Sequence, residues 1–466
     1  MIDAKAKVVG LARYTMDLYP RGTLYAKVKR SPLPHATIKS IDTSRAKALP
    51  GIIDVVTAGE SHSRRYGQII LDQEVLASEK VRFVGEPVAA VAATSLEAAE
   101  EALELIDVKY EELPAVLDPE QALSETPPAV VHPNLLRYGS EIDVRLGSIG
   151  LDPKRPNLGA HFKVRWGDVV KGFARADLVV ENRFTTQMMH AVPLEPFVSV
   201  TQMAEDGTLE VYTSTQTPFG VRQTLSRALD LPIAKIRVYT PCVGGGFGCK
   251  LDMKAEAVCG LLTLRTRRPV RLEFTREETF VCGSVRHPFI IDIKDGVTKD
   301  GLLTARQMKL ILDGGAYAGL GISVAKSSMY GTSEVYKVDN FWLDSYRAYT
   351  NKPHGGAFRG FGCAQSEWAI ESQMDILADK LGMDKVEFRL KNMLKPGDVT
   401  IIGERVTEDT VRTCLLRASE AIQWGQPKRP GHGPWKVGRG FASGAKYSRA
   451  PTIAAAEVKV WPEGYI

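Results

Sequence analysis

The sequence predicts an α+β protein in which a compact N-terminal unit precedes a larger mixed body. Short stretches of alternating β-formers recur along the chain, and amphipathic helical segments separate some of them. A chain of 466 residues is expected to form about three domains. Hydrophobic residues make up 44% and charged residues 25%, which is ordinary for a globular protein, so its core needs no disulfide or metal.

Composition excludes several classes of function. The formal charge of +5 is small for this length and is spread along the chain, so no nucleic-acid-binding face is expected. The six cysteines form no C-x-x-C pair, which argues against a zinc site or an iron–sulfur cluster in this chain and favours a reducing, cytoplasmic setting. The N-terminus lacks the apolar core of a signal peptide, and no run of about 18 apolar residues predicts a membrane span.

The first unit, residues 1–125, is predicted to contain strands around one helix. Its strand patterns lie at residues 24–28, 36–41, 52–56, 81–84, 88–93 and 106–110. Thr94 and Glu97 fit a capping box, so the helix is expected to begin after Thr94. Prolines between residues 114 and 133 then indicate a linker, which we place at residues 126–144.

The second unit, residues 145–425, is predicted to be a larger α/β or α+β body. Its strand patterns lie at residues 160–164, 178–184, 209–213, 235–240, 270–274 and 289–293. Asp295-Gly296 and Asp300-Gly301 are both turn signals. Residues 364–381 form a strongly amphipathic helix closed by Gly382, and Asp384 is expected to cap the next helix. The remaining tail, residues 426–466, carries a strand pattern at 453–460.

Two glycine-rich segments carry most of the functional information: residues 243–250 (VGGGFGCK) and residues 357–362 (AFRGFG). The first follows a strand pattern and opens a helical pattern. A glycine loop between a strand and a helix presents backbone N–H groups at the positive end of the helix, which suits a phosphate or pyrophosphate. Gln216 also follows a strand, and ligands of α/β sheets bind at such strand ends.

Spacing argues against two common nucleotide motifs. A P-loop requires glycine where Cys249 stands and a hydroxyl side chain where Leu251 stands. A dinucleotide fingerprint would end on the same two residues instead of on glycine. Three interpretations remain from the residues alone: a tight turn without a ligand, an unusual nucleotide-binding loop, or a loop for another phosphate-bearing cofactor.

Five motifs, in order along nearly the whole chain, resemble those of the molybdenum hydroxylases, the xanthine oxidase/aldehyde oxidoreductase family. They are residues 82–89 (RFVGEPVA), 190–196 (HAVPLEP), 215–217 (TQT), 244–248 (GGGFG) and 357–362 (AFRGFG). The chain is similar in particular to the N-terminal split half that forms the large molybdopterin subunit of nicotinate dehydrogenase-type enzymes. The resemblance implies an α/β hammerhead domain followed by the first molybdopterin-binding domain. It makes residues 426–466 the start of, or a strand extension toward, a second such domain.

The resemblance also implies a molybdopterin cofactor that carries molybdenum, expected in its cytosine dinucleotide form and held largely by backbone. The residues that would bind it are Gly245, Gly246, Phe247, Gly248, Phe358 and Arg359. Gln216 would donate a hydrogen bond to the oxo ligand of the metal, and Phe361 would stack on an aromatic substrate. No protein side chain is expected to coordinate the metal itself.

Departures from the family pattern narrow the function. Leu251 stands where xanthine-oxidising members carry a glutamate, and Gly360 where the carbon monoxide dehydrogenase branch carries a cysteine, so both chemistries are disfavoured. The family's general-base glutamate belongs to the second molybdopterin domain, and we do not expect Glu86 or Glu195 to replace it. We therefore expect three partner chains: one with the base glutamate, one with [2Fe–2S] clusters and one with FAD.

The expected activity is hydroxylation of an aromatic heterocycle or related small molecule by a heteromeric complex, with oxygen taken from water. Two alternatives use the same fold, namely aldehyde oxidation and aromatic acyl-CoA reduction. A non-catalytic scaffold that retains the fold is a further alternative. Elemental analysis for molybdenum separates all of these from a plain nucleotide-binding enzyme, and turnover by the assembled complex separates a catalyst from a scaffold.

Overall fold

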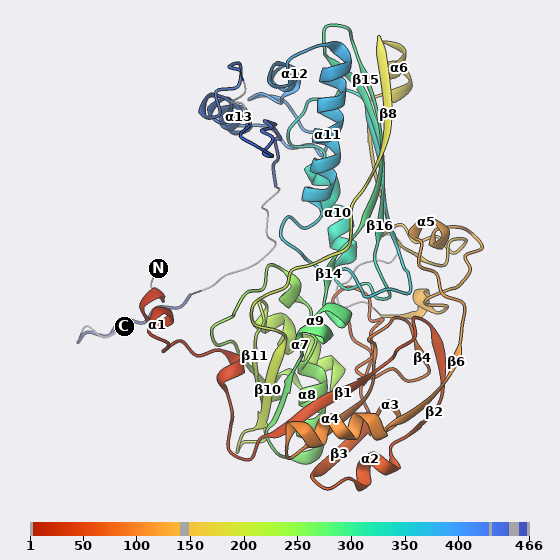
Figure 1. Cartoon of the computed structure of the whole chain (residues 1–466), viewed down its shortest axis with the longest axis vertical. Coiled ribbons are helices and arrows are strands. Elements are labelled where there is room, and N and C mark those ends of the chain that lie inside the picture. The colour runs from red at the N-terminus through yellow and green to blue at the C-terminus, as the bar shows by residue number, and fades with distance from the viewer. Residues whose placement is uncertain (1–2, 140–148, 428–430, 447–455, 464–466) are drawn as a thin grey trace.

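A computed structural model describes residues 3–139, 149–427, 431–446 and 456–463. The chain forms two lobes, one built around a seven-stranded sheet and the other around a long five-stranded sheet (Figure 1). Parallel and antiparallel pairs occur within each of these sheets, and helices pack on both, which confirms the α+β class. Within the described ranges, every helix is too short or too polar to cross a membrane.

The seven-stranded sheet joins the N-terminal unit to the body. Its strands, in sheet order, are β12 (Ile236–Tyr239), β11 (Leu209–Thr213), β10 (Val198–Met203), β13 (Val270–Glu273), β1 (Leu24–Arg30), β5 (Pro87–Ala93) and β3 (Ile52–Thr57). At the junction, β1 pairs parallel with β13, and Leu24 lies opposite Val270. The two units expected from the sequence therefore share one sheet, and each supplies part of the other's core.

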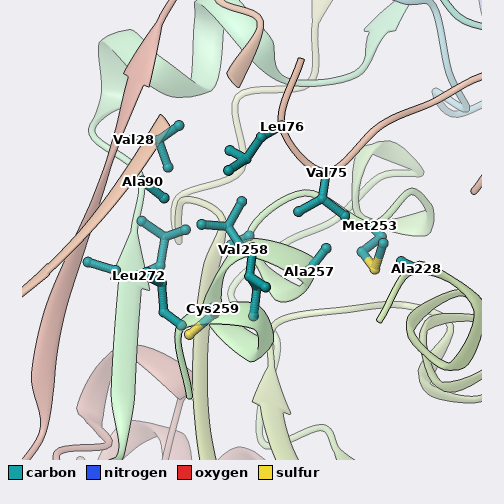
Figure 2. Close-up of a cluster of buried hydrophobic side chains, with 14 of the residues drawn as sticks. Val28, Val75, Leu76, Ala90, Ala228, Met253, Ala257, Val258, Cys259 and Leu272 are labelled. Atoms are coloured by element: carbon teal, nitrogen blue, oxygen red, sulfur yellow. The ribbon is translucent and has the colours of Figure 1, made fainter. Parts of the chain in front are cut away.

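Helices α7 (Pro218–Ala228) and α8 (Glu256–Thr266) pack against this sheet and against each other. Figure 2 shows Val258 and Cys259 of α8 among buried side chains from both units, including Val28 of β1 and Leu272 of β13. The first eight residues of α8 are all buried, which explains why its sequence has little amphipathic character.

The five-stranded sheet forms the second lobe. Its strands, in sheet order, are β7 (Leu158–Trp166), β17 (Phe341–Ala348), β16 (Leu303–Asp313), β15 (Phe289–Val297) and β8 (Leu178–Thr185). The long helix α11 (Cys363–Leu381) runs beside it in Figure 1 and packs on β15 and on α10 (Gly321–Gly331). As predicted, Gly382 ends α11 in a left-handed conformation, and Asp384 caps α12 (Lys385–Asn392).

The remaining elements are shorter. The small sheets contain β4 (Lys80–Val81), β2 (Ala36–Asp42) and β6 (Asp107–Glu112), and β14 (Val285–Arg286) with β9 (Met189–His190). The other α-helices are α1 (Ala4–Val8), α2 (Ser44–Ala48), α3 (Ala58–Ser61), α4 (Leu96–Leu105), α5 (Pro119–Ala122), α6 (Val169–Ala174), α9 (Arg276–Cys282) and α13 (Thr410–Ala421). Single 3₁₀ turns are η1 (Thr15–Asp17), η2 (Leu135–Arg137), η4 (Ile233–Lys235) and η5 (Cys249–Leu251).

Two predictions in the N-terminal unit are wrong in detail. Ser95, rather than Thr94, caps α4, because the Ser95 hydroxyl accepts the hydrogen bond from the Ala98 N–H at 3.2 Å. The strand expected at residues 81–84 reaches only Val81, because the chain turns there to bring Glu86 back onto the Arg82 N–H.

One prediction in the body and one in the tail are also wrong. Asp295-Gly296 lies inside β15 instead of forming a turn, because Asp295 pairs with the guanidinium of Arg306 at 2.7 Å and both side chains are fully buried. The turn uses Asp300-Gly301 instead. Of the strand expected at residues 453–460, residues 453–455 lie outside the described part, and residues 456–460 form no strand.

Candidate cofactor-binding site

The first glycine segment, residues 243–248, is a tight loop after β12. Gly245 and Gly248 have φ values of +98° and +104°, which favour glycine. The helix expected after this loop is present as α8, but the turn η5 lies between them and α8 begins only at Glu256, so the loop does not itself form the N-terminal end of the helix. The Glu256 carboxylate accepts a hydrogen bond from the Lys254 N–H at 2.7 Å, just before the helix, whose N-cap residue Ala255 makes no side-chain cap.

A buried ion pair holds the loop from behind. The Lys250 ammonium lies 3.1 Å from the Glu195 carboxylate, and the two side chains are 0% and 3% exposed. The same Glu195 oxygen accepts hydrogen bonds from the Gly244 N–H at 2.7 Å and from the Ser214 hydroxyl at 2.5 Å. Removing either charge would leave the other buried and unbalanced, so the pair fixes the loop strongly. Glu195 is thus a structural carboxylate, as the sequence suggested.

Gln216 reaches the same loop from the end of β11. Its side-chain oxygen accepts a hydrogen bond from the Gly248 N–H at 2.8 Å, and its backbone N–H donates to the Lys250 carbonyl at 3.0 Å. A backbone N–H can only donate, so this contact identifies which end of the amide is the oxygen. Gln216 is exposed, and its NH₂ group is therefore the end that can donate to a ligand.

The second glycine segment, residues 357–362, packs directly on the first. The Arg359 N–H donates to the Phe247 carbonyl at 2.9 Å. A β-carbon added to Gly248 would come within 2.8 Å of the Ala357 carbonyl oxygen, so the two backbones are in close contact. The main-chain N–H of Arg359, a predicted cofactor-binding residue, is therefore engaged in joining the two segments. Its side chain is exposed.

Two aromatic rings are set by strained backbone at this junction. Phe247 and Phe361 have φ values of +55° and +52°, which residues with side chains rarely adopt. Such strain persists only where the surroundings impose it, and it is frequent at functional sites. Phe247 is about half exposed, whereas Phe361 is partly buried against the core of the second lobe.

The structure brings the predicted residues together. Contacts link Gln216 to Gly246 and Gly248, Phe247 to Gly245 and Arg359, and Phe361 to Phe358. We call residues 245–248 and 357–361, together with Gln216, the cradle. They fit a cofactor that is held mainly by backbone, because the cradle is rich in glycine and the NH₂ group of Gln216 is placed to donate a hydrogen bond. None of them lines the cavity of about 250 Å³ between residues 66–73 and the first turns of α7. Within the cradle, Gln216, Phe247 and Arg359 are exposed, whereas Gly246 is buried.

Glu86 is not part of the cradle. Its carboxylate accepts hydrogen bonds from the Tyr317 hydroxyl and the Arg82 N–H, inside the contact between the N-terminal unit and the body. Burial raises the pKa of Glu86 to about 7, although Arg82 opposes the shift. Because both carboxylate oxygens are occupied by internal donors, Glu86 holds the two units together.

Sequence reasoning missed two basic residues that support the cradle. Lys250 was noted only for its place in the glycine motif, and its burial could not be foreseen. Arg286, in the two-residue strand β14, donates to the Arg359 carbonyl at 2.8 Å, and its guanidinium lies 4.0 Å from the centre of the Phe358 ring. No motif marks Arg286, because it is more than seventy residues from the segment that it touches.

Comparison with known proteins agrees with this geometry. Residues 9–114 match the model of the aldehyde oxidase and xanthine dehydrogenase a/b hammerhead domain, and residues 151–393 match that of the molybdopterin cofactor-binding domain. The nicotinate dehydrogenase large molybdopterin subunit of Eubacterium barkeri is 36% identical over 88% of this chain and 91% of its own length. The xanthine dehydrogenase molybdenum-binding subunit of Escherichia coli O157:H7 is 32% identical over 91% of this chain and 55% of its own length.

Solved structures give the same result. The aldehyde oxidoreductase of Desulfovibrio gigas superposes with a TM-score of 0.81 at 28% identity, over 90% of this chain and 46% of that one. Quinoline 2-oxidoreductase of Pseudomonas putida 86 superposes with a TM-score of 0.79 at 30% identity, over 90% of this chain and 53% of that one. The chain belongs to the xanthine dehydrogenase and aldehyde oxidoreductase family of molybdopterin-binding enzymes. It spans most of the Eubacterium barkeri subunit but only about half of the other relatives.

Proposed function

We propose that the chain is the molybdopterin-binding subunit of a molybdenum hydroxylase that acts on an aromatic heterocycle or a related small molecule. The reaction converts R–H and water into R–OH, two protons and two electrons. The observation that supports this proposal best is the contact between Gln216 and Gly248, because it leaves a neutral amide donor over the glycine segment.

When bound, the molybdenum cofactor would accept the two electrons and provide the water-derived oxygen. The backbone of residues 245–248 and 358–359 would cradle its pterin part, since glycine permits close approach. The Gln216 NH₂ would donate a hydrogen bond to an acceptor atom of the cofactor and so orient it without adding charge. The buried Lys250–Glu195 pair would keep the first segment from yielding as the cofactor binds.

The position of Phe361 is an argument for an aromatic substrate. Its positive φ fixes the ring at the end of the second segment, where it would offer a flat apolar surface for stacking. Two of the similar proteins are named for the nitrogen heterocycles nicotinate and quinoline. Aldehyde oxidation is the alternative, because an aldehyde oxidoreductase shares the fold equally well. Aromatic acyl-CoA reduction and a non-catalytic scaffold are not favoured by any contact in the cradle.

Exposed apolar side chains near the cradle are an argument for a partner chain that completes the site. Five exposed apolar side chains, called the apolar rim below, are Met189, Val192, Leu194, Phe247 and Phe280, which are 52%, 44%, 90%, 49% and 50% exposed. Residues 189–194 adjoin the cradle, because Met189 pairs with Arg286 and Pro193 lies beside Gly245, and the Phe280 ring lies against His190. Exposed apolar side chains gathered in one region mark an interface. We propose that a chain with the second molybdopterin domain covers this rim and brings the base glutamate. Iron–sulfur and FAD subunits would then receive the electrons.

The cytosine dinucleotide form of the cofactor is also part of the proposal. Molybdenum analysis and pterin release on the purified complex test the cofactor, and hydrolysis of the released pterin followed by nucleotide chromatography tests for cytidine monophosphate. Turnover with dye as electron acceptor, on nicotinate, quinoline and a simple aldehyde, then tests the substrate class. Turnover of the aldehyde alone would replace the heterocycle proposal with the alternative.

A further inference from the structure

Arg286 lies directly against the second glycine segment. One terminal nitrogen of its guanidinium donates to the Arg359 carbonyl at 2.8 Å, and the other donates to the Gln365 side-chain oxygen at 3.1 Å. The guanidinium carbon is 4.0 Å from the centre of the Phe358 ring. Gln365 is the third residue of α11, so this single side chain ties the segment to the helix that follows it.

All of these partners are neutral. Three other arginines that are buried or partly buried each contact a carboxylate: Arg30 with Glu278 at 3.0 Å, Arg306 with Asp295 at 2.7 Å and Arg389 with Glu371 at 2.8 Å. The fully buried Arg347 makes no such contact with the residues that the structure describes, but it lies near enough to Asp72 to oppose the rise in the pKa of that carboxyl. Across the described ranges, Arg286 takes part in no such ion pair. Burial lowers the pKa of Arg286, and no neighbouring charge contributes to that shift. A charge removed from water without a counter-charge is costly, so this cation calls for an anion.

The surroundings add to the positive charge. The 19-residue helix α11 has no acidic residue in its first turn and no side-chain cap. A cation near the N-terminal end of a helix is unfavourable, because the helix dipole is positive there. The exposed side chain of Arg359 is a second cation on the same segment. Nothing among these residues offsets the positive charge.

We propose that Arg286 is a positioning residue that holds the second glycine segment in place for the cofactor, and that an anionic group of the bound cofactor balances its charge. The inference rests on the proposed function, since it takes this segment to bind molybdopterin. The chemistry recognised is an oxyanion such as a phosphate. A substrate carboxylate is the other source of the same chemistry, and the test separates the two.

The test compares Arg286→Met and Arg286→Lys with wild type in the assembled complex, produced with and without molybdate. Arg165→Met is the matched control, because Arg165 also lies over an aromatic ring, Trp342 at 5.3 Å, but pairs with Asp344 and is remote from the cradle. Molybdenum and pterin per chain and the melting temperature are measured for each protein.

We expect Arg286→Met to lower the molybdenum and pterin content about tenfold, which corresponds to about 1.4 kcal/mol. Arg286→Lys should retain most of the content, because it keeps the charge. In cofactor-free protein, Arg286→Met should melt at or above the wild-type temperature, since it removes an unbalanced charge. A merely structural arginine would give the opposite result, a loss of stability with and without cofactor. Arg165→Met should load like wild type.

Two results would overturn the inference. One is full cofactor content in Arg286→Met. The other is an equal loss of melting temperature in the loaded and cofactor-free forms. If the content is normal but the KM of nicotinate rises while that of quinoline does not, the anion belongs to the substrate, and the assignment to the cofactor is wrong. Absence of molybdenum and pterin from the wild-type complex would instead refute the proposed function, before any variant is compared.

Discussion

The side-chain oxygen of Gln216 accepts a hydrogen bond from the backbone N–H of Gly248 at 2.8 Å. This contact connects the end of β11 to the first glycine segment, and it settles the orientation of the amide. The role of Gln216 therefore has two parts, acceptance from Gly248 and donation to a ligand; one substitution can remove donation alone and another can remove both.

Gln216→Glu and Gln216→Ala should both slow reduction of the loaded complex by substrate. The glutamate keeps an acceptor for Gly248 but has no NH₂ donor, whereas alanine loses both. If donation stabilises developing charge, the activation free energy of reduction should rise by about 2–4 kcal/mol in each variant. Stopped-flow spectroscopy measures the corresponding fall in rate. Gln202→Ala, on β10 and bonded to Glu210, is the control. Reduction of Gln216→Glu at the wild-type rate would remove the donor role.

Gly246→Ala should impair cofactor loading through Gln216. A β-carbon at residue 246 would lie 2.5 Å from the Gln216 side-chain oxygen, so the amide must move and the Gly248 contact breaks. In the Gln216→Ala background the same substitution should lower the molybdenum content much less, because the side chain that it displaces is already absent and the two residues are therefore coupled. Molybdenum content measured over this double-mutant cycle tests the coupling. Gly59→Ala is the control, since nothing lies within 4 Å of its added β-carbon. Additive effects would contradict the prediction.

Stability should fall as pH rises toward neutrality because of Glu86. Burial raises the pKa of Glu86 from 4.5 to about 7, so between these values the folded chain binds a proton that the unfolded chain has released. The contribution of Glu86 to the free energy of unfolding is present in full below the unfolded pKa of 4.5. It falls by about 3 kcal/mol as pH rises to the folded pKa of about 7. Denaturation at about pH 5 and about pH 8 should show a loss of stability in wild type that is smaller by about 3 kcal/mol in Glu86→Gln. Part of the loss remains in this variant, because burial also raises the pKa of Asp72 to about 6 and those of Glu334 and Glu367 to about 7. Glu97 is exposed, so Glu97→Gln should behave like wild type. If stability falls with pH in Glu86→Gln as steeply as in wild type, Glu86 is not the cause of the fall.

The apolar rim should control association. Leu194→Ser and Phe280→Ser should make the isolated chain less prone to self-association and should weaken its binding to the partner chain, because both side chains lie exposed beside the cradle. Sedimentation velocity of the isolated chain and of the mixture with its partner measures both effects. Leu302→Ser, at the β15–β16 turn, serves as control, because Leu302 is 44% exposed, close to the 50% of Phe280. Unchanged partner binding in both rim variants would place the interface elsewhere.

The two glycine segments could be located from the sequence because their signals are local. Gln216 follows a strand, as the pattern predicted, and the structure adds that Gly245 and Gly248 adopt positive φ. The capping error at Thr94 and Ser95 is of another kind, since adjacent residues compete for the same role and a shift of one residue leaves the pattern unchanged.

What the sequence could not predict depends on contacts between distant residues. The pairing of β1 with β13 unites residues more than two hundred positions apart, so two apparent domains share a sheet. Asp295-Gly296 is a good turn signal until Arg306 is placed beside it in the interior. Arg286 reaches the cradle only through the fold, and no local pattern separates it from any other arginine.

The most direct test of the central claim is the metal and pterin content of the complex, purified with its partner chains. Molybdenum is measured by mass spectrometry, and pterin by fluorescence after oxidative release. We predict about one molybdenum and one pterin per copy of this chain, and loss of both in Gly246→Ala, whose added β-carbon would displace Gln216. An active complex that contains neither molybdenum nor pterin would contradict the assignment.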